Sequence, residues 1–188
     1  MSNIVLTYST IEGVVLTEPA RFGDHRGFFA ETYSHRAYAE LGIDAMFVQD
    51  NHSFSAAVGT VRGLHFQAPP LEQAKLVRRG QGAIFDVVID IRRGSPTYGR
   101  WAGFTLSAEN GTQLYIPVGV AHGFATLEPD SEIIFRCSDY YAPETEGALR
   151  WDHPDIGIKW SFKGTPVLCE KDASAPLLAG FNTPRDNR

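Results

Sequence analysis

The chain has 188 residues, of which 43% are hydrophobic and 12% aromatic, enough to fill the core of one domain. Its formal net charge is −5 and it contains no basic run, which argues against binding to nucleic acid. The two cysteines, Cys137 and Cys169, lie far apart and outside any CxxC pattern, so they predict neither a disulfide framework nor a zinc site.

The first twenty residues carry no basic segment, and polar residues interrupt their apolar run. We therefore expect neither a signal peptide nor a membrane span, and a cytoplasmic location. The sequence shows no repeat and no linker, so we expect one domain over residues 1–182 followed by a short C-terminal tail over residues 183–188.

Short runs of β-branched and aromatic residues are separated by glycine, proline, asparagine and aspartate at intervals of about ten residues, which is typical of an all-β sandwich or barrel. In chain order these runs predict strands at residues 14–17, 27–33, 47–53, 60–67, 75–79, 82–91, 100–107, 112–116, 122–126 and 132–139. One helix is indicated, over residues 34–42, where Ser34 can cap the start and Gly42 can end it.

The strand around residues 84–92 has two different faces. Phe85, Val87, Ile89 and Ile91 form an apolar face, and the alternate positions carry two carboxylates among apolar residues. A barrel with a partly polar lumen that holds a ligand gives such a strand. A sandwich with one solvated face gives it equally well, and this segment alone favours neither interpretation.

Two segments place a histidine after a glycine turn and a five-residue strand: residues 59–72, with His65, and residues 111–122, with His122. Their spacing resembles the two signature motifs of the cupin superfamily, whose barrel mouth usually binds a metal through histidines and a glutamate. Gln67 occupies a position where a cupin has a histidine ligand, and a neutral amide is a poor ligand for such metals. His65, Glu72 and His122 could still bind a metal, so a metal-dependent isomerase or dioxygenase is an alternative.

The surroundings of His65 indicate a site for an anionic ligand. Arg62 precedes this histidine by three residues and Lys75 follows it by ten, so one predicted hairpin carries an imidazole, a guanidinium and an ammonium group. Leu64 and Phe66 mark the same strand as part of the core, where cations are costly to bury without an anionic partner.

Nine stretches of the chain together resemble one known family, the dTDP-4-dehydrorhamnose 3,5-epimerases, cupin-fold enzymes of deoxysugar biosynthesis. The matching stretches are residues 22–29, 49–53, 61–67, 75–78, 85–92, 106–110, 121–124, 139–141 and 170–172. The similarity extends from about residue 14 to about residue 178 and implies an all-β double-stranded β-helix, or jelly-roll (cupin) barrel, with a few short helices.

The resemblance also implies an activity, the epimerisation of a nucleotide sugar of the dTDP-4-keto-6-deoxy-glucose type, without a cofactor or a metal. The ketone at carbon 4 acidifies the hydrogens on carbons 3 and 5. His65 matches the family's base, Asp172 the carboxylate that pairs with that base, and Lys75 the cation beside the keto oxygen.

Further positions match the family's substrate contacts. Arg62 corresponds to the group that holds the diphosphate. Arg26 and Glu31 correspond to residues on N-terminal strands that are exchanged with the other subunit, so the resemblance implies a homodimer. The remaining matches are Gln49, Asn51, Lys75, His122, Phe135, Tyr140, Glu146 and Lys171.

Phe135 departs from the family pattern. The family has a tyrosine at this position that donates the second proton, and phenylalanine has no acidic hydroxyl. We therefore expect impaired double epimerisation, with action mainly at carbon 3 and the second proton supplied by solvent or another group such as Tyr140. A catalytically silent sugar-nucleotide-binding cupin is a further alternative.

Overall fold

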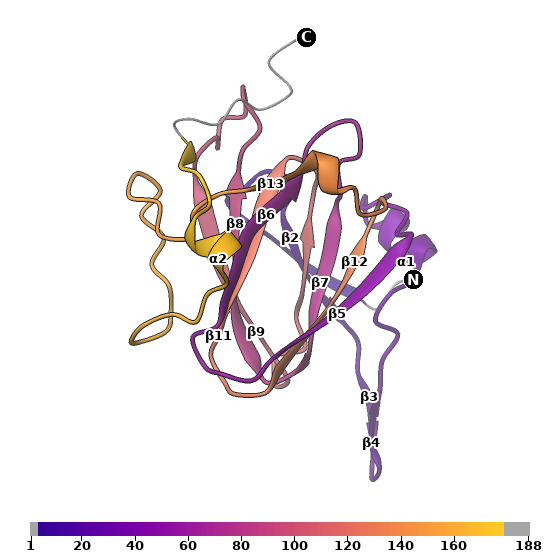
Figure 1. The fold of residues 1–188 in the computed structure, drawn as a ribbon. Coiled ribbons are helices and arrows are strands. Elements are labelled where there is room, and N and C mark those ends of the chain that lie inside the picture. Colours follow the sequence, from indigo (N-terminus) through magenta and orange to yellow (C-terminus); the bar gives the residue numbers. More distant parts are fainter. Residues whose placement is uncertain (1–3, 179–188) are drawn as a thin grey trace.

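The computed structural model describes residues 4–178 and shows a mostly β protein in which two sheets pack face to face, with a few short helices (Figure 1). The larger sheet has the order β1 (Ile4–Tyr8), β2 (Val15–Pro19), β10 (Gln113–Ile116), β7 (Lys75–Gln81), β12 (Ser131–Cys137) and β5 (Gln49–Ser55). The smaller sheet has the order β13 (Glu146–Ala148), β6 (Val61–Gln67), β11 (Val120–Thr126), β8 (Ala83–Asp90) and β9 (Trp101–Ser107).

All neighbouring strands within these two sheets are antiparallel. From β5 to β8 the chain alternates between the sheets, and it does so again from β9 to β12. Each of the ten predicted strands overlaps an observed one, so the all-β prediction with few short helices is confirmed. The chain path also agrees with the jelly-roll expectation.

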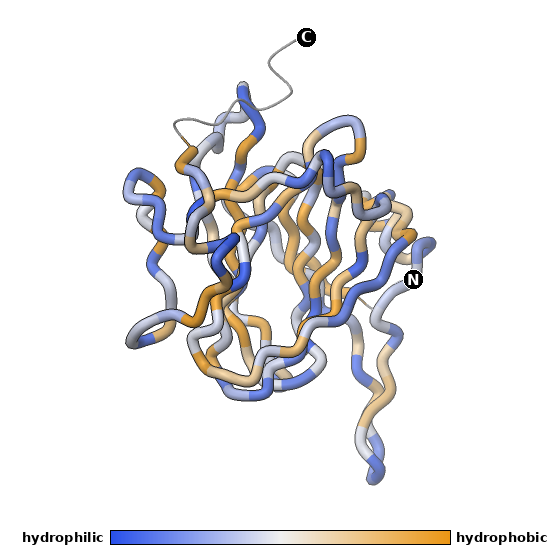
Figure 2. The backbone as a smooth tube through the Cα atoms, viewed as in Figure 1, coloured by the Kyte–Doolittle hydropathy of each residue, from blue (hydrophilic) through white to orange (hydrophobic). Residues whose placement is uncertain are grey.

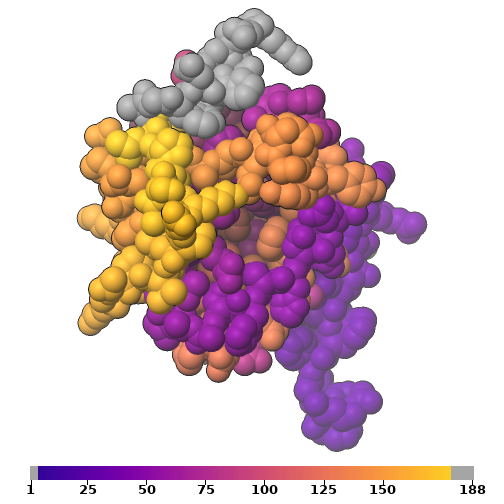
Figure 3. Space-filling view, viewed as in Figure 1, coloured from indigo at the N-terminus to yellow at the C-terminus, as the bar shows by residue number. Residues whose placement is uncertain are grey.

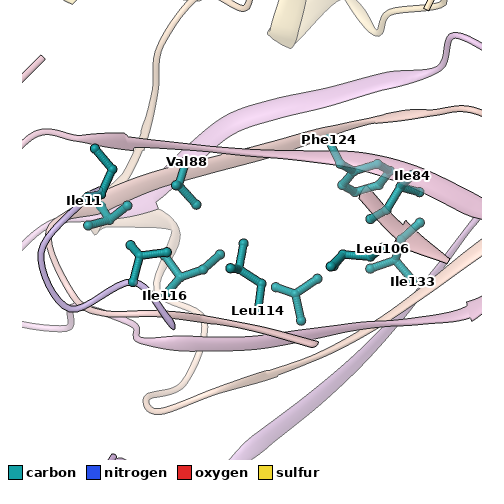
Figure 4. Packing of buried hydrophobic residues seen from close by; sticks show 11 residues of the cluster. Ile11, Ile84, Val88, Leu106, Leu114, Ile116, Phe124 and Ile133 are labelled. Atoms are coloured by element: carbon teal, nitrogen blue, oxygen red, sulfur yellow. The ribbon is translucent and has the colours of Figure 1, made fainter. Parts of the chain in front are cut away.

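The main apolar core lies between the two sheets (Figure 4). Ile84 and Val88 of β8 face Leu114 and Ile116 of β10 across this space, and Ile133 of β12 extends the cluster. Figure 2 shows hydrophobic positions concentrated along the strands of both sheets. Burial of these branched side chains from two sheets at once is what holds the sheets together.

Both faces of β8 are buried. The face with Asp86 and Asp90 points between the sheets, and both aspartates are completely buried. The wholly apolar face packs outward against a second cluster that includes Leu149 and Ile156 from the C-terminal segment. The sequence therefore identified the two faces correctly, but the interpretation with one solvated face is wrong, because the face with the two carboxylates is buried between the sheets.

Helix α1 (His35–Glu40) confirms the predicted helix. The Ser34 side chain caps its first turn by accepting a hydrogen bond from the amide of Ala37, and Gly42 follows the helix with a φ of 85°, which suits glycine. The Tyr38 ring is fully buried against the outer face of the larger sheet, where its hydroxyl bonds to Thr17 Oγ1 at 2.9 Å.

Short elements that sequence patterns did not indicate complete the fold. They are β1, β3 (Phe22–Asp24), β13, the 3-10 helix η1 (Pro143–Thr145) and α2 (Glu170–Ala173). The strand expected at residues 27–33 is shorter, because only β4 (Gly27–Phe29) pairs with β3 and the rest leads to α1. The β3–β4 hairpin projects from the body of the molecule (Figure 1), with Phe22, Phe28 and Phe29 exposed.

Two expectations concern the ends and the location of the chain. The tail expected at residues 183–188 lies outside the described residues. Within residues 4–178, no helix is long and apolar enough to cross a membrane.

Candidate active site

A cavity of about 300 Å³ opens at one end of the space between the two sheets. Strands β5, β6, β7 and β12, the loop between β6 and β7, and the segment after β12 supply its lining. The lining residues are Gln49, Asn51, His65, Phe66, Gln67, Gln73, Lys75, Phe135, Cys137, Tyr141 and Glu146. Figure 3 shows a hollow on this face between the orange segment that contains η1, the yellow segment that contains α2 and the purple strands. The structure thus brings together His65, Lys75, Gln49, Asn51, Phe135 and Glu146, all of which the sequence nominated.

His65 and Asp172 form a close pair at this cavity. Nε2 of His65 lies 2.6 Å from Oδ1 of Asp172, whose side chain is only 3% exposed. The other carboxylate oxygen accepts a hydrogen bond from the amide of Gly63 at 3.2 Å. Burial disfavours the charged form of Asp172, but the hydrogen bond and charge of His65, together with the Gly63 amide, keep the pKa of this carboxyl below its ordinary value. An ionised carboxylate therefore orients the imidazole, whose Nδ1 remains to exchange a proton.

Glycine at two positions lets the strands approach closely behind this pair. The pairing of β6 with β11 shifts register between His122 and Phe124, opposite Gly63. A Cβ on Gly63 would lie 2.6 Å from Cα of Gly123, and Gly63 has a φ of 120°, which other residues rarely adopt. The irregular pairing leaves the Gly63 amide free to bind Asp172 instead of the neighbouring strand.

Lys75 begins β7 and pairs in register with Cys137 of β12, so the two side chains share a wall of the cavity. Burial lowers the pKa of the Lys75 ammonium, against the opposing influence of Cys137, Asp86 and Glu146. Asp86 and Glu146 thus help to keep a cation inside the molecule. Such a cation can stabilise negative charge that develops on a bound ligand.

His122 lies on β11 directly beside His65, as the register partner of that residue. Its Nε2 is 3.0 Å from the carboxylate of Asp86, which is completely buried on β8. The sequence predicted His122 and gave Asp86 no role. The alternation along β8 showed that a carboxylate shares a face with core residues, which is the signal that could have identified Asp86.

Glu146 of β13 links this strand to α2 at the edge of the cavity. It accepts hydrogen bonds from Lys171 Nζ at 2.6 Å and from the Tyr141 hydroxyl at 3.0 Å. Burial disfavours its charged form, but these two donors keep the pKa of Glu146 below its usual value, and Glu146 raises the pKa of Lys171. The ion pair connects β13 to α2, the helix that carries Asp172.

Gln67 has a structural explanation. Its amide nitrogen donates to the carbonyl oxygens of Leu71 at 2.5 Å and Tyr140 at 3.2 Å, and its oxygen accepts from the amide of Ala142 at 2.9 Å. All of its polar atoms therefore brace loops at the rim of the cavity. The side chain is committed to these contacts at the position where a cupin has a metal ligand.

The donors needed by the metal-dependent alternative do not gather. Within the part of the chain that the structure describes, no three histidine, cysteine, aspartate or glutamate side chains are grouped so as to hold a metal ion, and His65, Glu72 and His122 are no exception. His65 and His122 instead each pair with a separate carboxylate. The donor set therefore does not fit a resident metal.

Several nominated residues lie elsewhere in this chain. Arg62 donates from the far end of β6 to Ser55 Oγ at 3.2 Å and to the Phe54 carbonyl at 3.0 Å. Arg26 lies at the tip of the β3–β4 hairpin, paired with Asp24, and Glu31 follows that hairpin. Tyr140 is largely exposed and is not among the lining residues.

Sequence reasoning did not assign a ligand-facing role to Gln73, Cys137 or Tyr141. Cys137 follows Phe135 by two residues, so strand alternation places both on one face of β12. Tyr141 is the second tyrosine of an adjacent pair, and only the course of the loop decides which of the two lines the cavity.

Comparison with known proteins gives a consistent result. Residues 8–180 match the family model described as dTDP-4-dehydrorhamnose 3,5-epimerase. A dTDP-4-dehydrorhamnose 3,5-epimerase from Sinorhizobium fredii is 50% identical over 169 residues, which cover 90% of this chain and 87% of the relative.

Solved structures of similar proteins include ligand complexes. The epimerase RmlC from Legionella pneumophila, in complex with dTDP-4-keto-L-rhamnose, matches with a TM-score of 0.91 at 42% identity and covers 95% of each chain. ChmJ from Streptomyces bikiniensis, a 3'-monoepimerase in complex with dTDP-quinovose, matches with a TM-score of 0.86 at 37% identity, covering 91% of this chain and 86% of that one.

Proposed function

The chain belongs to the dTDP-4-dehydrorhamnose 3,5-epimerase family and is a sugar-nucleotide epimerase, an isomerase of a cofactor-independent type, and we propose that it acts on a dTDP-linked 4-keto-6-deoxy-hexose of the glucose type. The observation that carries the proposal is the pair of His65 with the buried Asp172, 2.6 Å apart at the wall of the cavity. We propose further that residues 1–182 act as one domain, in line with the extent of the family match.

His65 is the base in this proposal. It removes the proton from a carbon next to the ketone, and the electron pair of that C–H bond forms a C=C double bond while the carbonyl π electrons move to oxygen. The product is an enolate and an imidazolium, and the carboxylate of Asp172 stabilises the latter. Delivery of a proton to the opposite face of the carbon completes the inversion.

Lys75 stabilises the enolate oxygen. Its ammonium lies on the wall formed by β7 and β12 and has few water molecules to compete with a bound ligand, since it is partly buried. Such a cation accelerates the reaction because it stabilises negative charge that appears only in the transition state. Removal of a comparable group raises the activation free energy by about 3 kcal/mol. Asp86 supports this role, because its carboxylate favours the charged form of Lys75 against the effect of burial on the pKa.

The remaining cavity residues bind the substrate. Gln49 and Asn51 line the cavity and offer amide groups to the sugar. His122 lies next to His65, outside the residues that line the cavity, and offers its imidazole from there. The linked pair of Glu146 and Lys171 closes the rim. Arg62 holds the diphosphate with its planar guanidinium. Two of the three nitrogens of this group donate hydrogen bonds to Ser55 and Phe54 within the described chain, which leaves Nη1 for a ligand. Tyr140 contacts the substrate from outside the cavity.

Phe135 limits the outcome to carbon 3. Its ring lines the cavity but has no proton to give, so the strand that supplies the second proton in the family lacks a donor here. Action at one carbon has a precedent, since the similar protein ChmJ is described as a 3'-monoepimerase. Tyr141, whose hydroxyl is held by Glu146, is nearer to the ligand space than Tyr140 and is an alternative donor besides solvent.

Incubation with dTDP-4-keto-6-deoxy-glucose in deuterated water, followed by NMR, tests the activity and its position together. We expect deuterium at carbon 3 with inversion there and slow exchange at carbon 5. Rapid deuterium incorporation at both carbons with inverted carbon 5 would contradict the carbon 3 assignment. A complete absence of exchange, at carbon 3 as well as at carbon 5, would contradict the activity.

Replacement of His65 by asparagine separates catalysis from binding. We expect His65→Asn to lower the exchange rate by about 10²–10⁴-fold while dTDP binding persists, because asparagine cannot act as the base. His35→Asn, on the surface of α1, is the matched control and should exchange at the wild-type rate. Equal exchange in wild type and His65→Asn would show that this histidine is not the base.

The homodimer belongs to the same proposal. The β3–β4 hairpin projects from the body and exposes Phe22, Phe28 and Phe29, and among residues 4–178 β1 is the edge strand of the larger sheet. Exposed aromatics and an open edge are features that a second subunit covers. Exchange of these N-terminal strands would bring Arg26 and Glu31 of one subunit to the cavity of the other.

A further inference from the structure

A second cavity, of about 140 Å³, lies where the base of the β3–β4 hairpin meets the larger sheet. Its lining includes Arg21, Arg78, Arg79, Gln113 and Phe28, and it shares no lining residue with the substrate cavity. Strand β7 contributes to both cavities. Lys75 at its start lines the substrate cavity, and Arg78 and Arg79 near its other end line the second cavity. The two cavities are therefore separate sites on one strand.

Three guanidinium groups meet here without a carboxylate partner. Arg21 donates to the carbonyl oxygens of Ala108 and Glu109 at 3.0 and 3.2 Å and stacks over the Phe28 ring. Within the described part of the chain, Arg79 donates only to the carbonyl of its neighbour Gly80, at 2.6 Å. Among residues 4–178, no ion pair joins any of the three arginines to an acid.

The arginines also repel one another. Burial lowers the pKa of Arg79, and the positive charges of Arg21 and Arg78 lower it further, against a weaker opposing influence of Glu128. An arginine side chain stays protonated under such conditions, so the repulsion is not relieved by loss of a proton. An anion between the guanidinium groups relieves it.

Two buried polar atoms at this cavity have no hydrogen bond within the described chain. One is the donor Nε of Arg79, and the other is the acceptor Oε1 of Gln113, a side chain only 2% exposed. The orientation of the Gln113 amide is fixed, because its nitrogen donates to the Thr32 carbonyl at 2.9 Å. Buried polar groups are normally paired, so this cavity lacks a partner that both accepts and donates.

We propose that the cavity binds a phosphate group, as inorganic phosphate or as the terminal group of a phosphomonoester. A phosphate accepts from all three guanidinium groups, and its protonated oxygen donates to Gln113 Oε1, which sulfate at neutral pH cannot do. The cavity is large enough for a phosphate, because its volume of about 140 Å³ compares with roughly 10–15 Å³ for one water molecule. The site is independent of the proposed substrate cavity.

Calorimetric titration with inorganic phosphate at constant ionic strength tests this site. We expect saturable binding, weaker binding of sulfate, and at least tenfold weaker phosphate binding in Arg79→Gln. Arg21→Gln, at the more exposed side of the cavity, should weaken binding too and guards against misfolding of the first variant. Arg36→Gln, on the surface of α1, is the matched control and should bind as the wild type does.

The substrate cavity must be distinguished as a source of phosphate binding. Arg62→Gln should therefore bind phosphate with the wild-type affinity. Saturation of the wild type with dTDP should likewise leave its phosphate affinity unchanged. Glucose 1-phosphate added in place of phosphate decides between the two sources, since stronger binding identifies a phosphomonoester and weaker binding identifies free phosphate.

Three results would overturn the proposal. The first is absence of saturable heat in the wild type, and the second is equal phosphate affinity in the wild type, Arg79→Gln and Arg21→Gln. The third is a sedimentation result in which Arg79→Gln changes the oligomeric state and added phosphate does not. This result would assign the cavity to carboxylates of a second copy of the chain.

Discussion

At the scale of single residues, the proposed mechanism assigns proton transfer to His65 and the orientation of this histidine to Asp172. They are 107 positions apart in the chain and 2.6 Å apart in space. The depressed pKa of Asp172 keeps its carboxylate ionised near neutral pH, so its charge is available when His65 becomes an imidazolium. The same burial that makes the carboxylate costly also prevents water from weakening its interaction with the histidine.

Asp172→Asn tests this division. Asparagine keeps the shape and the contact with the Gly63 amide but loses the charge, so we expect kcat to fall by roughly 10³–10⁴-fold with little change in dTDP affinity. Steady-state kinetics and calorimetry measure the two quantities. A fall in dTDP affinity with unchanged kcat would instead assign Asp172 to ligand binding.

Phe135→Tyr tests the missing donor. The new hydroxyl would stand in the cavity at the position where the family resemblance implies a proton donor, so we expect deuterium exchange at carbon 5 to rise by about 10²-fold or more. NMR in deuterated water measures it. Phe162→Tyr, outside the cavity lining, is the control, and an unchanged carbon 5 rate in Phe135→Tyr would show that another group already donates this proton.

At the scale of elements, the connection after β8 depends on one buried carboxylate. Asp90 accepts hydrogen bonds from Arg92, Ser95 and Thr97, which fix the turn that leads to β9. Burial alone would raise the pKa of Asp90, but these donors lower it to about 2 from an ordinary value of 3.8. The folded state thus strongly favours the charged form of this side chain.

Stability should follow this pKa. The contribution is complete above pH 3.8, the ordinary value, and is lost as the pH falls toward about 2. The shift corresponds to about 2 kcal/mol of unfolding free energy, the expected loss in Asp90→Asn at pH 7. Urea unfolding should show that the difference between wild type and variant shrinks below pH 4, whereas Asp155→Asn, at an exposed position, should show no such trend. A difference that stays constant down to pH 2 would contradict this assignment.

The short elements explain why sequence patterns gave an incomplete account at this scale. Strands of seven or eight residues such as β7 and β8 carry enough alternation to be found, and their predicted bounds were close. Helix α2 has four residues and β13 has three, too few for any periodicity. Yet α2 supplies Asp172 and β13 supplies Glu146, so the least visible elements position two of the site residues.

At the scale of the whole molecule, the proposed exchange of N-terminal strands makes a sharp prediction for mixed subunits. His65→Asn and Arg26→Ala should each be nearly inactive as pure proteins. In a mixed dimer, the Arg26→Ala subunit keeps its own His65 and receives an intact Arg26 from its partner. Unfolding and refolding equal amounts together should therefore restore about a quarter of the wild-type sites.

Activity assays before and after mixing measure this effect. Refolding each variant alone is the control and should restore nothing. If Arg26 serves the cavity of its own chain, no mixed dimer contains a complete site, and the mixture will remain inactive.

The sequence by itself determined the strand pattern, the helix at residues 34–42 and the two-faced nature of β8, because each depends on residues adjacent in the chain. Motif resemblance also nominated His65, Lys75 and Asp172, of which the structure pairs the first with the last and places His65 and Lys75 at one cavity. Tertiary structure alone decided that His122 binds Asp86, that Tyr141 and not Tyr140 lines the cavity, and that Arg21, Arg78 and Arg79 surround a second one. These contacts depend on the order and register of strands, which bring together side chains that no local pattern connects.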